Sequence, residues 1–378
     1  MKKRICIDIR ICQKSSRYTG VGIYAYHISK FIEENNSEFE FWYLVLKGKE
    51  LPWKLPLDRL ISLKRPNKPE SIQEVFDFFD LKYLLKKNKI SIFHSLVPGM
   101  LSPAKSLSVV TTIHDIIPDI LPLENYTSLF ARFLYRLKMK ISLKSSYIIT
   151  DSIATKKDFT RVYNFKKQNI STVYLSSQFS NDHVLTIHKS KEIVWGRKYL
   201  LYTGGFNYRK NVPMVINSFA SIADEFPEVD LLLIGKPSNA QLYELNNIIE
   251  SFSDLKGRII LKGFISDTDL PKYYSNCEAF IYPSFYEGFG IPVLEAMQCC
   301  APVITSDRGS IPEVVGLSGI MVNPESISEI SEAISKVLKD PNLQTLLRNK
   351  GLQQARNFSW ETCAIETIKV YRNILKIS

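Results

Sequence analysis

Two glutamates flank a glycine-containing turn in the segment FYEGFGIPVLEAM, residues 285–297. Pro292 fits the first position of a helix, where its missing N–H costs nothing, so the turn predicts free amide N–H groups at a helix start. Such amides suit an anion or a polar oxygen, and Glu287 and Glu295 can accept hydrogen bonds from paired sugar hydroxyls. Compensation of the helix dipole, worth about 0.3–1 kcal/mol, explains Glu295 alone but not the pair with the glycines. The segment therefore favours a pocket for a nucleotide-linked sugar.

Two cations follow a second glycine turn, in YTGGFNYRKN at residues 202–211. Gly204 and Gly205 form the turn after an apolar strand, and Arg209 and Lys210 lie on the approach to the next helix. Charge-assisted hydrogen bonds contribute about 1.5–3 kcal/mol each, and donors aimed at developing negative charge contribute about 10²–10³ in rate. This arrangement suits a diphosphate leaving group. The alternative is a pair of solvated cations that cap a loop.

A histidine–aspartate pair, His114 and Asp115, ends the apolar strand expected at residues 108–113. A lone histidine is more often a structural residue than a catalyst. Its place at the carboxyl end of a strand, where open α/β sheets bind their ligands, makes a role in catalysis the competing interpretation.

The segment TGVGIYA, residues 19–25, matches the dinucleotide fingerprint G-x-G-x-x-A. About ten residues separate Gly20 from the preceding strand, whereas the fingerprint follows its strand directly. A nicotinamide or flavin oxidoreductase is therefore the weaker alternative, although Gly20 and Gly22 still allow a helix N-terminus to approach phosphate.

Size and composition predict a globular protein with two domains. The chain has 378 residues, of which 45% are hydrophobic and 23% charged, which excludes the fibrous and disordered classes. No apolar run approaches the roughly 18 residues of a membrane-spanning helix. The six cysteines form no C-x-x-C pair and predict a reducing, cytosolic compartment, and His183 and His188 lack the acidic or thiol partners of a metal site.

A formal net charge of +11 predicts an anionic partner. Ten basic residues and two acids lie between Arg132 and Lys167. Residues 127–144 also carry apolar side chains at helical spacing, namely Phe130, Phe133, Leu134, Leu137 and Ile141. Two interpretations stay open: a core helix with a solvated basic back, or docking of segment 132–167 on an anionic membrane, where each basic residue adds about 1 kcal/mol. Without a nucleic-acid-binding module, nucleic acid is not an expected partner.

Alternating strands and helices must position these motifs. Short apolar strands are expected at residues 4–9, 40–46, 91–94, 108–113, 147–150, 199–203, 230–234, 258–262, 279–283, 302–306 and 319–322. Helices are expected near residues 21–34, 71–86 and 127–144, and after each strand of the second half. Apolar strands separated by helices predict parallel sheets covered on both faces.

The predicted fold class is therefore α/β, with two doubly wound, Rossmann-like domains that face each other across a cleft. We place the N-terminal domain at residues 1–185 and the C-terminal domain at 195–358, with a polar linker at 176–197. Ser359 is expected to cap a last helix, residues 359–378, that packs back on the N-terminal domain.

The segment FYEGFGIPVLEAM is similar to the E-x7-E signature of the retaining glycosyltransferases of family 4, which have the GT-B fold. DRGSIPEVVG at residues 307–316 resembles the next turn of that family, and TGGFNYRKN and TIHDIIP resemble its mannosyltransferase branch. The resemblance covers residues 20–360 and is strongest from 199 to 316. It implies an acceptor-binding N-terminal domain and a nucleotide-sugar-binding C-terminal domain. Many members have Gly-Arg where this chain has Gly204-Gly205, and Arg209 would take over the task of that arginine.

The resemblance implies a catalytic set of four residues. Glu287 would hold the hydroxyls of the transferred sugar, and Arg209 and Lys210 would neutralise the diphosphate. His114 would contact the donor sugar near the reacting carbon. No metal or cofactor is implied, because two cations and helix N-termini stand where a metal would be needed.

The resemblance also implies a donor-binding set, in which Glu295 holds the nucleotide ribose. Backbone groups supply most of the other contacts to the phosphates, the sugar and the base, through Gly20, Gly22, Gly205, Phe264, Ile265, Phe289, Gly290 and Ile291.

The implied function is a metal-independent, retaining hexosyltransferase of cell-surface polysaccharide or lipopolysaccharide synthesis. It would move a sugar, with mannose from GDP-mannose favoured, to a hydroxyl of a glycan or lipid-linked acceptor. We expect it in the cytoplasm, with the inner membrane face as an alternative site. A different sugar (glucose, rhamnose or N-acetylglucosamine) and a non-catalytic nucleotide-sugar binder are the remaining alternatives.

Overall fold

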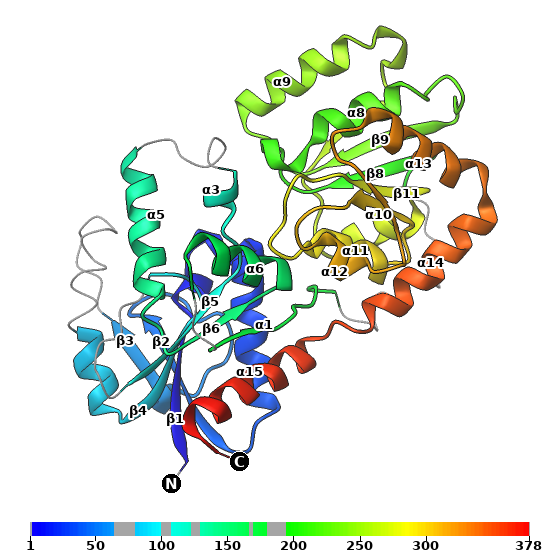
Figure 1. The fold of residues 1–378 in the computed structure, drawn as a ribbon. Coiled ribbons are helices and arrows are strands. Elements are labelled where there is room, and N and C mark those ends of the chain that lie inside the picture. The colour runs from blue at the N-terminus through cyan, green and yellow to red at the C-terminus, as the bar shows by residue number, and fades with distance from the viewer. Residues whose placement is uncertain are drawn as a thin grey trace. The chain divides into compact units, whose positions relative to one another are not determined.

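The computed structural model describes residues 2–63, 80–99, 107–121, 129–165, 169–179 and 194–377, and it separates into two compact units (Figure 1). Unit 1 consists of Met1–Asp119, Tyr126–Leu175 and Ser359–Ser378. Unit 2 consists of Ile120–Asn125 and Ser176–Phe358. Most of the expected linker and part of the expected helix at 71–86 lie outside the described residues.

In the described residues of unit 1, seven parallel strands form one sheet in the order β3-β2-β1-β4-β5-β6-β7. The strands are β1 (Lys3–Asp8), β2 (Phe39–Leu46), β3 (Leu60–Leu63), β4 (Ile90–Ser95), β5 (Ser108–Ile113), β6 (Tyr147–Thr150) and β7 (Ile170–Thr172). The sequence analysis missed β3 and β7. Both are short edge strands, so neither carries the long apolar run of a strand with neighbours on two sides.

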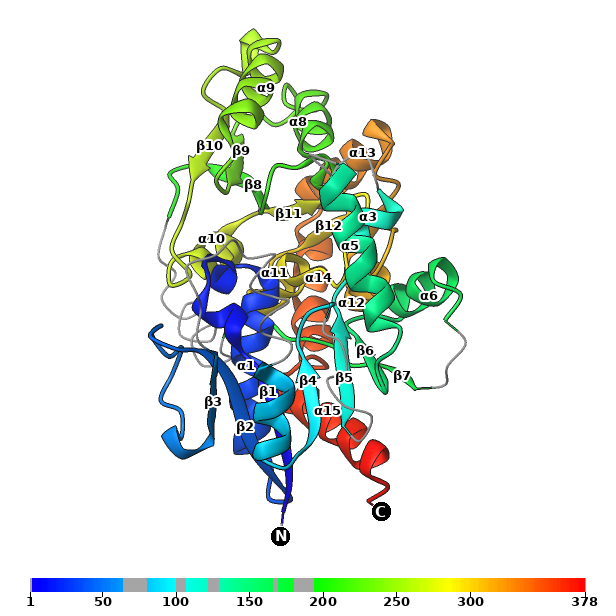
Figure 2. The same ribbon diagram turned by 90° about the vertical axis from the view of Figure 1, so that its left-hand side faces the viewer.

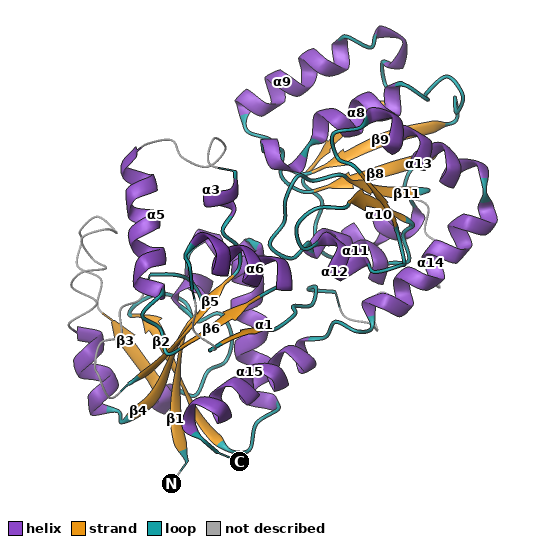
Figure 3. Ribbon diagram, viewed as in Figure 1, coloured by secondary structure: helices purple, strands orange, loops and turns teal. Residues whose placement is uncertain are grey.

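Helices cover this sheet on both faces (Figure 3). They are α1 (Gly20–Glu34), α3 (Ile117–Ile120), α5 (Leu129–Ser142), α6 (Ile153–Val162) and α15 (Trp360–Leu375), with the 3₁₀ turns η1 (Arg10–Gln13), η2 (Ser15–Tyr18) and η3 (Leu57–Arg59). The described residues 80–87 are also helical. Because β5, β6 and β7 are neighbours in chain order, right-handed crossovers place α5 and α6 on one face of the sheet (Figure 2).

The last helix, α15, belongs to unit 1 and lies beside α1 (Figure 1). Ser359 caps it by accepting a hydrogen bond from the amide of Thr362. The Trp360 ring stacks on His27 at 4.9 Å between ring centroids. At its other end the hydroxyl of the fully buried Tyr371 lies 2.7 Å from Nδ1 of His94.

Unit 2 contains, in its described residues, six parallel strands in the order β10-β9-β8-β11-β12-β13. They are β8 (Lys198–Thr203), β9 (Val229–Ile234), β10 (Ile259–Gly263), β11 (Ala279–Tyr282), β12 (Val303–Ser306) and β13 (Ile320–Val322). The helices are α8 (Val212–Ala220), α9 (Asn239–Glu250), α10 (Leu270–Asn276), α11 (Ile291–Gln298), α12 (Ile311–Val315), α13 (Ile327–Lys339) and α14 (Pro341–Ala355), with the 3₁₀ turns η4 (Tyr208–Lys210) and η5 (Ser253–Leu255). All residues of β9 and β11 are buried, as expected for strands covered on both faces.

Candidate active site

The acidic and basic motifs of unit 2 meet at the carboxyl ends of two neighbouring strands. Arg209 and Lys210 lie in η4 after β8, and Glu287 lies in the turn between β11 and α11. Because β8 pairs with β11, the two turns are adjacent. Nη1 of Arg209 lies 2.6 Å from Oε2 of Glu287, and Nζ of Lys210 lies 2.8 Å from Oε1. The structure therefore brings the three predicted residues into one cluster.

The cluster is buried and includes a tyrosine that the sequence analysis did not single out. The hydroxyl of Tyr282 donates to Oε1 of Glu287 at 3.0 Å and accepts a hydrogen bond from the amine of Lys210. That amine also lies 4.9 Å from the centroid of the Tyr282 ring. Burial alone raises the pKa of Glu287, but the two cations outweigh it and hold the pKa below its ordinary value. The carboxylate is therefore ionised, with cations at both of its oxygens.

Backbone contacts fix the turn that carries the two cations. Asn211 follows Lys210 with a left-handed backbone, φ 58°, and its side-chain amide donates to the carbonyls of Pro283 and Pro324 at 3.0 and 2.7 Å. The amide of Phe285 donates to the carbonyl of Arg209 at 2.8 Å. These bonds connect the η4 turn to the acidic turn, so the position of the cations is set by two strand ends together.

The glycine turn ends in the N-terminus of α11. Gly290 has φ 103°, and a Cβ atom there would lie 2.6 Å from Cδ1 of Ile311, so the position requires glycine. α11 begins at Ile291, and no side chain caps it. Phe289 is buried just before this helix start. The predicted amide site is thus a helix N-terminus directly beside Glu287 in the chain.

Glu295 lies one turn into α11, past the first turn in which an acid compensates the helix dipole. It accepts a hydrogen bond from the hydroxyl of Tyr274 at 3.1 Å, and that hydroxyl is also bonded to Oγ1 of Thr203 at 2.6 Å. Burial raises the pKa of Glu295 to about 8. Unlike Glu287, this carboxyl is therefore largely protonated at neutral pH in the chain without a ligand.

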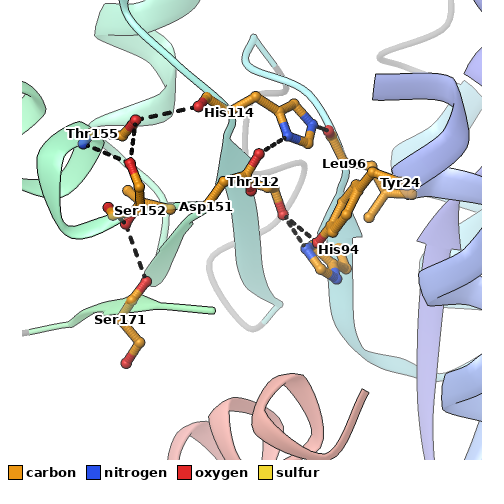
Figure 4. Close-up of polar contacts among 10 residues, drawn as sticks. Tyr24, His94, Leu96, Thr112, His114, Asp151, Ser152, Thr155 and Ser171 are labelled. Atoms are coloured by element: carbon orange, nitrogen blue, oxygen red, sulfur yellow. Dashed lines mark hydrogen bonds and ion pairs between the residues drawn. The ribbon is translucent and has the colours of Figure 1, made fainter. Parts of the chain in front are cut away.

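In unit 1, the ring of His114 is held at both nitrogens (Figure 4). Nδ1 lies 2.6 Å from Oδ2 of the buried Asp151, and Nε2 donates to the carbonyl of Leu96 at 2.9 Å. Burial lowers the pKa of His114, but Asp151 and the Leu96 carbonyl raise it above its ordinary value. Both ring nitrogens thus face hydrogen-bond acceptors, an arrangement that favours the protonated ring.

The carboxylate that bonds the His114 ring is not that of its sequence neighbour Asp115. Asp115 accepts a hydrogen bond from the amide of Ile117 at 3.0 Å, while the partner of the ring is Asp151, directly after β6. The edge of the Tyr24 ring packs against the imidazole, with 4.9 Å between centroids. The predicted contact of His114 with a donor sugar stays a prediction.

Packing explains one of the two predicted glycines at the start of α1. A Cβ atom at Gly22 would lie 2.4 Å from the carbonyl oxygen of Ser16 and 2.5 Å from Cα of Arg17, so η2 packs directly on this position. Gly20 is the first residue of α1 and is exposed. Their predicted contact with phosphate is a separate question and stays a prediction.

The remaining donor-binding candidates lie at the ends of β8 and β10. The carbonyl of Gly205 accepts a hydrogen bond from the hydroxyl of Tyr202. Phe264, directly after β10, is 75% exposed, and Ile265 is half-buried. A large apolar side chain so exposed at a strand end is available to a ligand, and the predicted contact with the base stays a prediction.

Two features that the described residues lack bear on other classes of protein. No group of three or more histidine, cysteine, aspartate or glutamate side chains is arranged to hold a metal ion in that part of the chain. Among the helices described, none is both long and apolar enough to cross a membrane.

Comparison with known proteins matches both units to glycosyltransferase models. The model described as "Glycosyltransferase Family 4" matches residues 18–175, and that of "Glycosyl transferases group 1" matches residues 184–354. O-antigen chain mannosyltransferase B of Escherichia coli is 30% identical over 297 residues, which are 77% of this chain and 76% of that protein. The chain belongs to glycosyltransferase family 4. The predicted family is thereby confirmed.

Further relatives of this glycosyltransferase have similar descriptions. O-antigen chain mannosyltransferase RfbU of Salmonella typhimurium is 28% identical over 238 residues, 63% of each protein. The serotype-specific mannosyltransferase WbdA of Escherichia coli is 31% identical over 182 residues, which are 48% of this chain but 22% of WbdA.

Solved structures confirm the GT-B fold of this glycosyltransferase. Sucrose-phosphate synthase from Thermosynechococcus elongatus matches with a TM-score of 0.76 at 18% identity, covering 100% of both chains. WaaG, a glycosyltransferase involved in lipopolysaccharide biosynthesis, matches with a TM-score of 0.71 at 14% identity, covering 97% of this chain and 99% of that one.

The basic helix α5 of this glycosyltransferase exposes the apolar residues that were expected in a core. Phe130, Phe133 and Leu137 are 64%, 61% and 43% exposed. The interpretation of a core helix with a solvated basic back is therefore wrong for these three positions. Helical spacing predicted an amphipathic helix correctly, but spacing does not say whether another element covers the apolar side.

Proposed function

We propose that this glycosyltransferase transfers mannose from GDP-mannose to a hydroxyl of a glycan or lipid-linked acceptor, with retention of the anomeric configuration and without a metal. The observation that carries the proposal is the buried cluster of Arg209, Lys210 and Glu287 beside an uncapped helix start. Two cations and helix amides suit the charge of a diphosphate. The choice of mannose is supported by the mannosyltransferase descriptions of the relatives.

In the proposed reaction, the bond between the sugar carbon and the diphosphate oxygen breaks, and the acceptor oxygen bonds to that carbon from the same face. The acceptor proton passes to the leaving nucleoside diphosphate. Arg209 and Lys210 stabilise the negative charge that develops on the diphosphate. Glu287 has a lowered pKa and cations at both oxygens, so it is a poor nucleophile and suits sugar hydroxyls instead. This supports a mechanism without a covalent sugar–enzyme intermediate.

Glu295 is proposed to bind the ribose, which requires only hydrogen bonds to hydroxyls. A protonated carboxyl both donates and accepts, so the raised pKa is compatible with this role.

A transfer assay of the purified chain with different nucleotide sugars as donors tests the proposal. Thermal-shift measurements with GDP-, UDP-, ADP- and dTDP-sugars identify the base, since a ligand of the folded state raises the melting temperature with its concentration. Lys210→Ala is expected to lower the transfer rate by about 10²–10³. Lys336→Ala, at an exposed position of α13, is the matched control. Equal activity of the two variants would contradict the site, and an inverted product in an NMR spectrum or full dependence on a divalent metal would contradict the mechanism.

We also infer that the enzyme works in the cytoplasm, bound peripherally to an anionic membrane through α5. The sequence of α5, LFARFLYRLKMKIS, contains four basic residues and no acid. Arg136 and Lys140 are exposed beside the stripe of Phe130, Phe133 and Leu137. An exposed apolar stripe flanked by cations complements a membrane with negatively charged headgroups. Six free cysteines support a reducing compartment.

Sedimentation with phosphatidylglycerol vesicles tests this contact. Insertion of one phenylalanine contributes about 1.5–3 kcal/mol, so Phe133→Asp is expected to weaken vesicle binding about tenfold or more. Tyr83→Asp is the matched control, because Tyr83 is 65% exposed in the helical residues 80–87 of the same unit. Equal loss in both variants, or no binding of the wild-type chain to these vesicles, would refute the membrane contact.

A further inference from the structure

A groove of about 730 Å³ lies between α6 and β7, wholly within unit 1. The side chains that line it are Ile153, Lys156, Lys157, Thr160, Arg161, Ser171 and Thr172. Because one wall is the edge strand of the sheet and the other is the helix that precedes it in the chain, the groove does not depend on unit 2.

The chemistry of the groove is that of an anion site. Its described lining consists of three cations, three hydroxyls and one aliphatic side chain, with no carboxylate. Arg161 pairs with Asp158 at 2.6 Å, whereas neither Lys156 nor Lys157 forms an ion pair in the described part of the chain. Arg161 is thus already compensated by Asp158, and an anionic ligand would reduce the repulsion between the two lysines. Amines, a guanidinium and hydroxyls are the donors that phosphate oxygens accept.

One end of the groove lies near the strand ends that carry His114. α6 starts directly after Asp151 and Ser152, and Ser152 caps it by accepting a hydrogen bond from the amide of Thr155 at 3.0 Å. Thr155 in turn donates to the carbonyl of His114 at 3.3 Å (Figure 4). The first turn of α6, with Ile153 at one end of the groove, therefore lies at the same strand ends as the His114 ring.

The volume selects the class of ligand. It falls within the range of about 300–1,000 Å³ of small-molecule sites, which exceeds the size of a free phosphate ion. The groove therefore has room for a phosphate joined to a saccharide.

We propose that the α6–β7 groove binds the phosphate or diphosphate ester of a saccharide acceptor. The acceptor part of this proposal rests on the proposed transferase function, but the binding of a phosphate ester does not. Lys156 and Lys157 hold the phosphate oxygens, Arg161 adds a third cation, and the hydroxyl of Ser171 completes the set of donors.

Isothermal titration of inorganic pyrophosphate into the full chain tests the binding part. The wild-type chain is expected to show two binding events, one at this groove and one at the cations of unit 2. Lys156→Ala with Lys157→Ala removes the first event, while Lys210→Ala weakens the second. Lys86→Ala with Lys87→Ala is the matched control, an adjacent pair of exposed lysines on another helical segment of unit 1. An unchanged titration of the Lys156/Lys157 variant would refute phosphate binding at the groove, whatever the outcome for Lys210.

Two further experiments show whether the bound phosphate belongs to a saccharide acceptor or to a lipid headgroup. With an acceptor saccharide that carries a phosphate ester, the Lys156/Lys157 variant is expected to raise KM about tenfold or more at constant kcat. The same saccharide without phosphate gives equal KM values for variant and wild type. If the variant instead loses binding to phosphatidylglycerol vesicles and keeps its pyrophosphate binding, the lysines are membrane contacts and the proposal is wrong.

Discussion

Glu287→Ala separates the structural role of this carboxylate from its role in binding a donor. Arg209 and Lys210 lie within 2.8 Å of the Glu287 oxygens, and the lysine and the glutamate are 8% and 6% exposed. Removal of one partner from a buried ion pair leaves a charge without compensation and costs about 3–5 kcal/mol. For a unit of this size, each kcal/mol lowers the melting temperature by about 2–4 °C. The variant is therefore expected to melt roughly 6–20 °C below the wild-type protein.

A diphosphate supplies the negative charge that this variant lacks. GDP is therefore expected to raise the melting temperature of Glu287→Ala more than that of the wild-type chain, in which the cations are already paired with a carboxylate. The transfer rate is expected to fall by about 10²–10³ even at saturating donor. Differential scanning fluorimetry with and without GDP, together with a transfer assay, measures these quantities.

Glu225→Ala is the control for the loss of a carboxylate. Glu225 forms an exposed ion pair with Lys339 in the same unit, and such a pair contributes about 0–1 kcal/mol. If Glu287→Ala melts within a degree or two of Glu225→Ala, the cluster is not the buried ion network described above. If GDP stabilises Glu287→Ala and wild type equally, the cations do not receive the diphosphate.

Three further predictions follow from the site and its supports. Burial raises the pKa of Glu295 from 4.5 to about 8, so between these pH values the folded chain keeps a proton that the unfolded chain loses. The free energy of unfolding therefore falls by about 1.4 kcal/mol per pH unit in this range. Urea titrations at pH 5 and pH 8 should show that the stability of Glu295→Gln increases relative to that of the wild-type chain as pH rises. Asp151→Asn is expected to lower the pKa of His114, measured by NMR of its ring. A histidine whose pKa is raised in the folded state stabilises the fold when the pH is below its ordinary pKa, near 6.5, and this stabilisation is lost as the pH rises through the folded pKa. The loss of unfolding free energy in Asp151→Asn should therefore be larger at pH 6 than at pH 9. Gly290→Ala is expected to cost about 1–3 kcal/mol, more than Gly257→Ala, because both have positive φ but only the former brings a Cβ within 2.6 Å of another side chain; equal melting temperatures would contradict this.

The sequence predicted the meeting of Glu287, Arg209 and Lys210 because parallel sheets gather strand ends at one edge. It did not predict the hydroxyls of Tyr282 in the apolar strand β11 and of Tyr274 in the short helix α10, because local sequence does not distinguish such a tyrosine from a core aromatic residue. The hydrogen bonds of these hydroxyls depend on which elements lie side by side, and no local sequence pattern predicts that order.

Asp151 was within reach of sequence reasoning and was still missed. It follows the predicted strand at residues 147–150 directly, as His114 follows the strand at 108–113. The rule for strand ends pairs these two side chains once β5 and β6 are known to be neighbours. Adjacency in the chain favoured Asp115 instead, whose carboxylate is used in a local turn.

Because α15 completes unit 1, that unit cannot finish folding until residues that follow unit 2 in the chain have been made. During synthesis, the side of α1 that receives the Trp360 ring stays uncovered, and Nδ1 of the buried His94 lacks its contact with Tyr371, until residues 360–375 emerge from the ribosome. Unit 2 needs none of those residues, so the order of folding is expected to run against the order of translation, with the later-encoded unit compact first. In a nascent chain stalled just after residue 358, unit 1 would thus be incomplete, with apolar surface that a chaperone could bind.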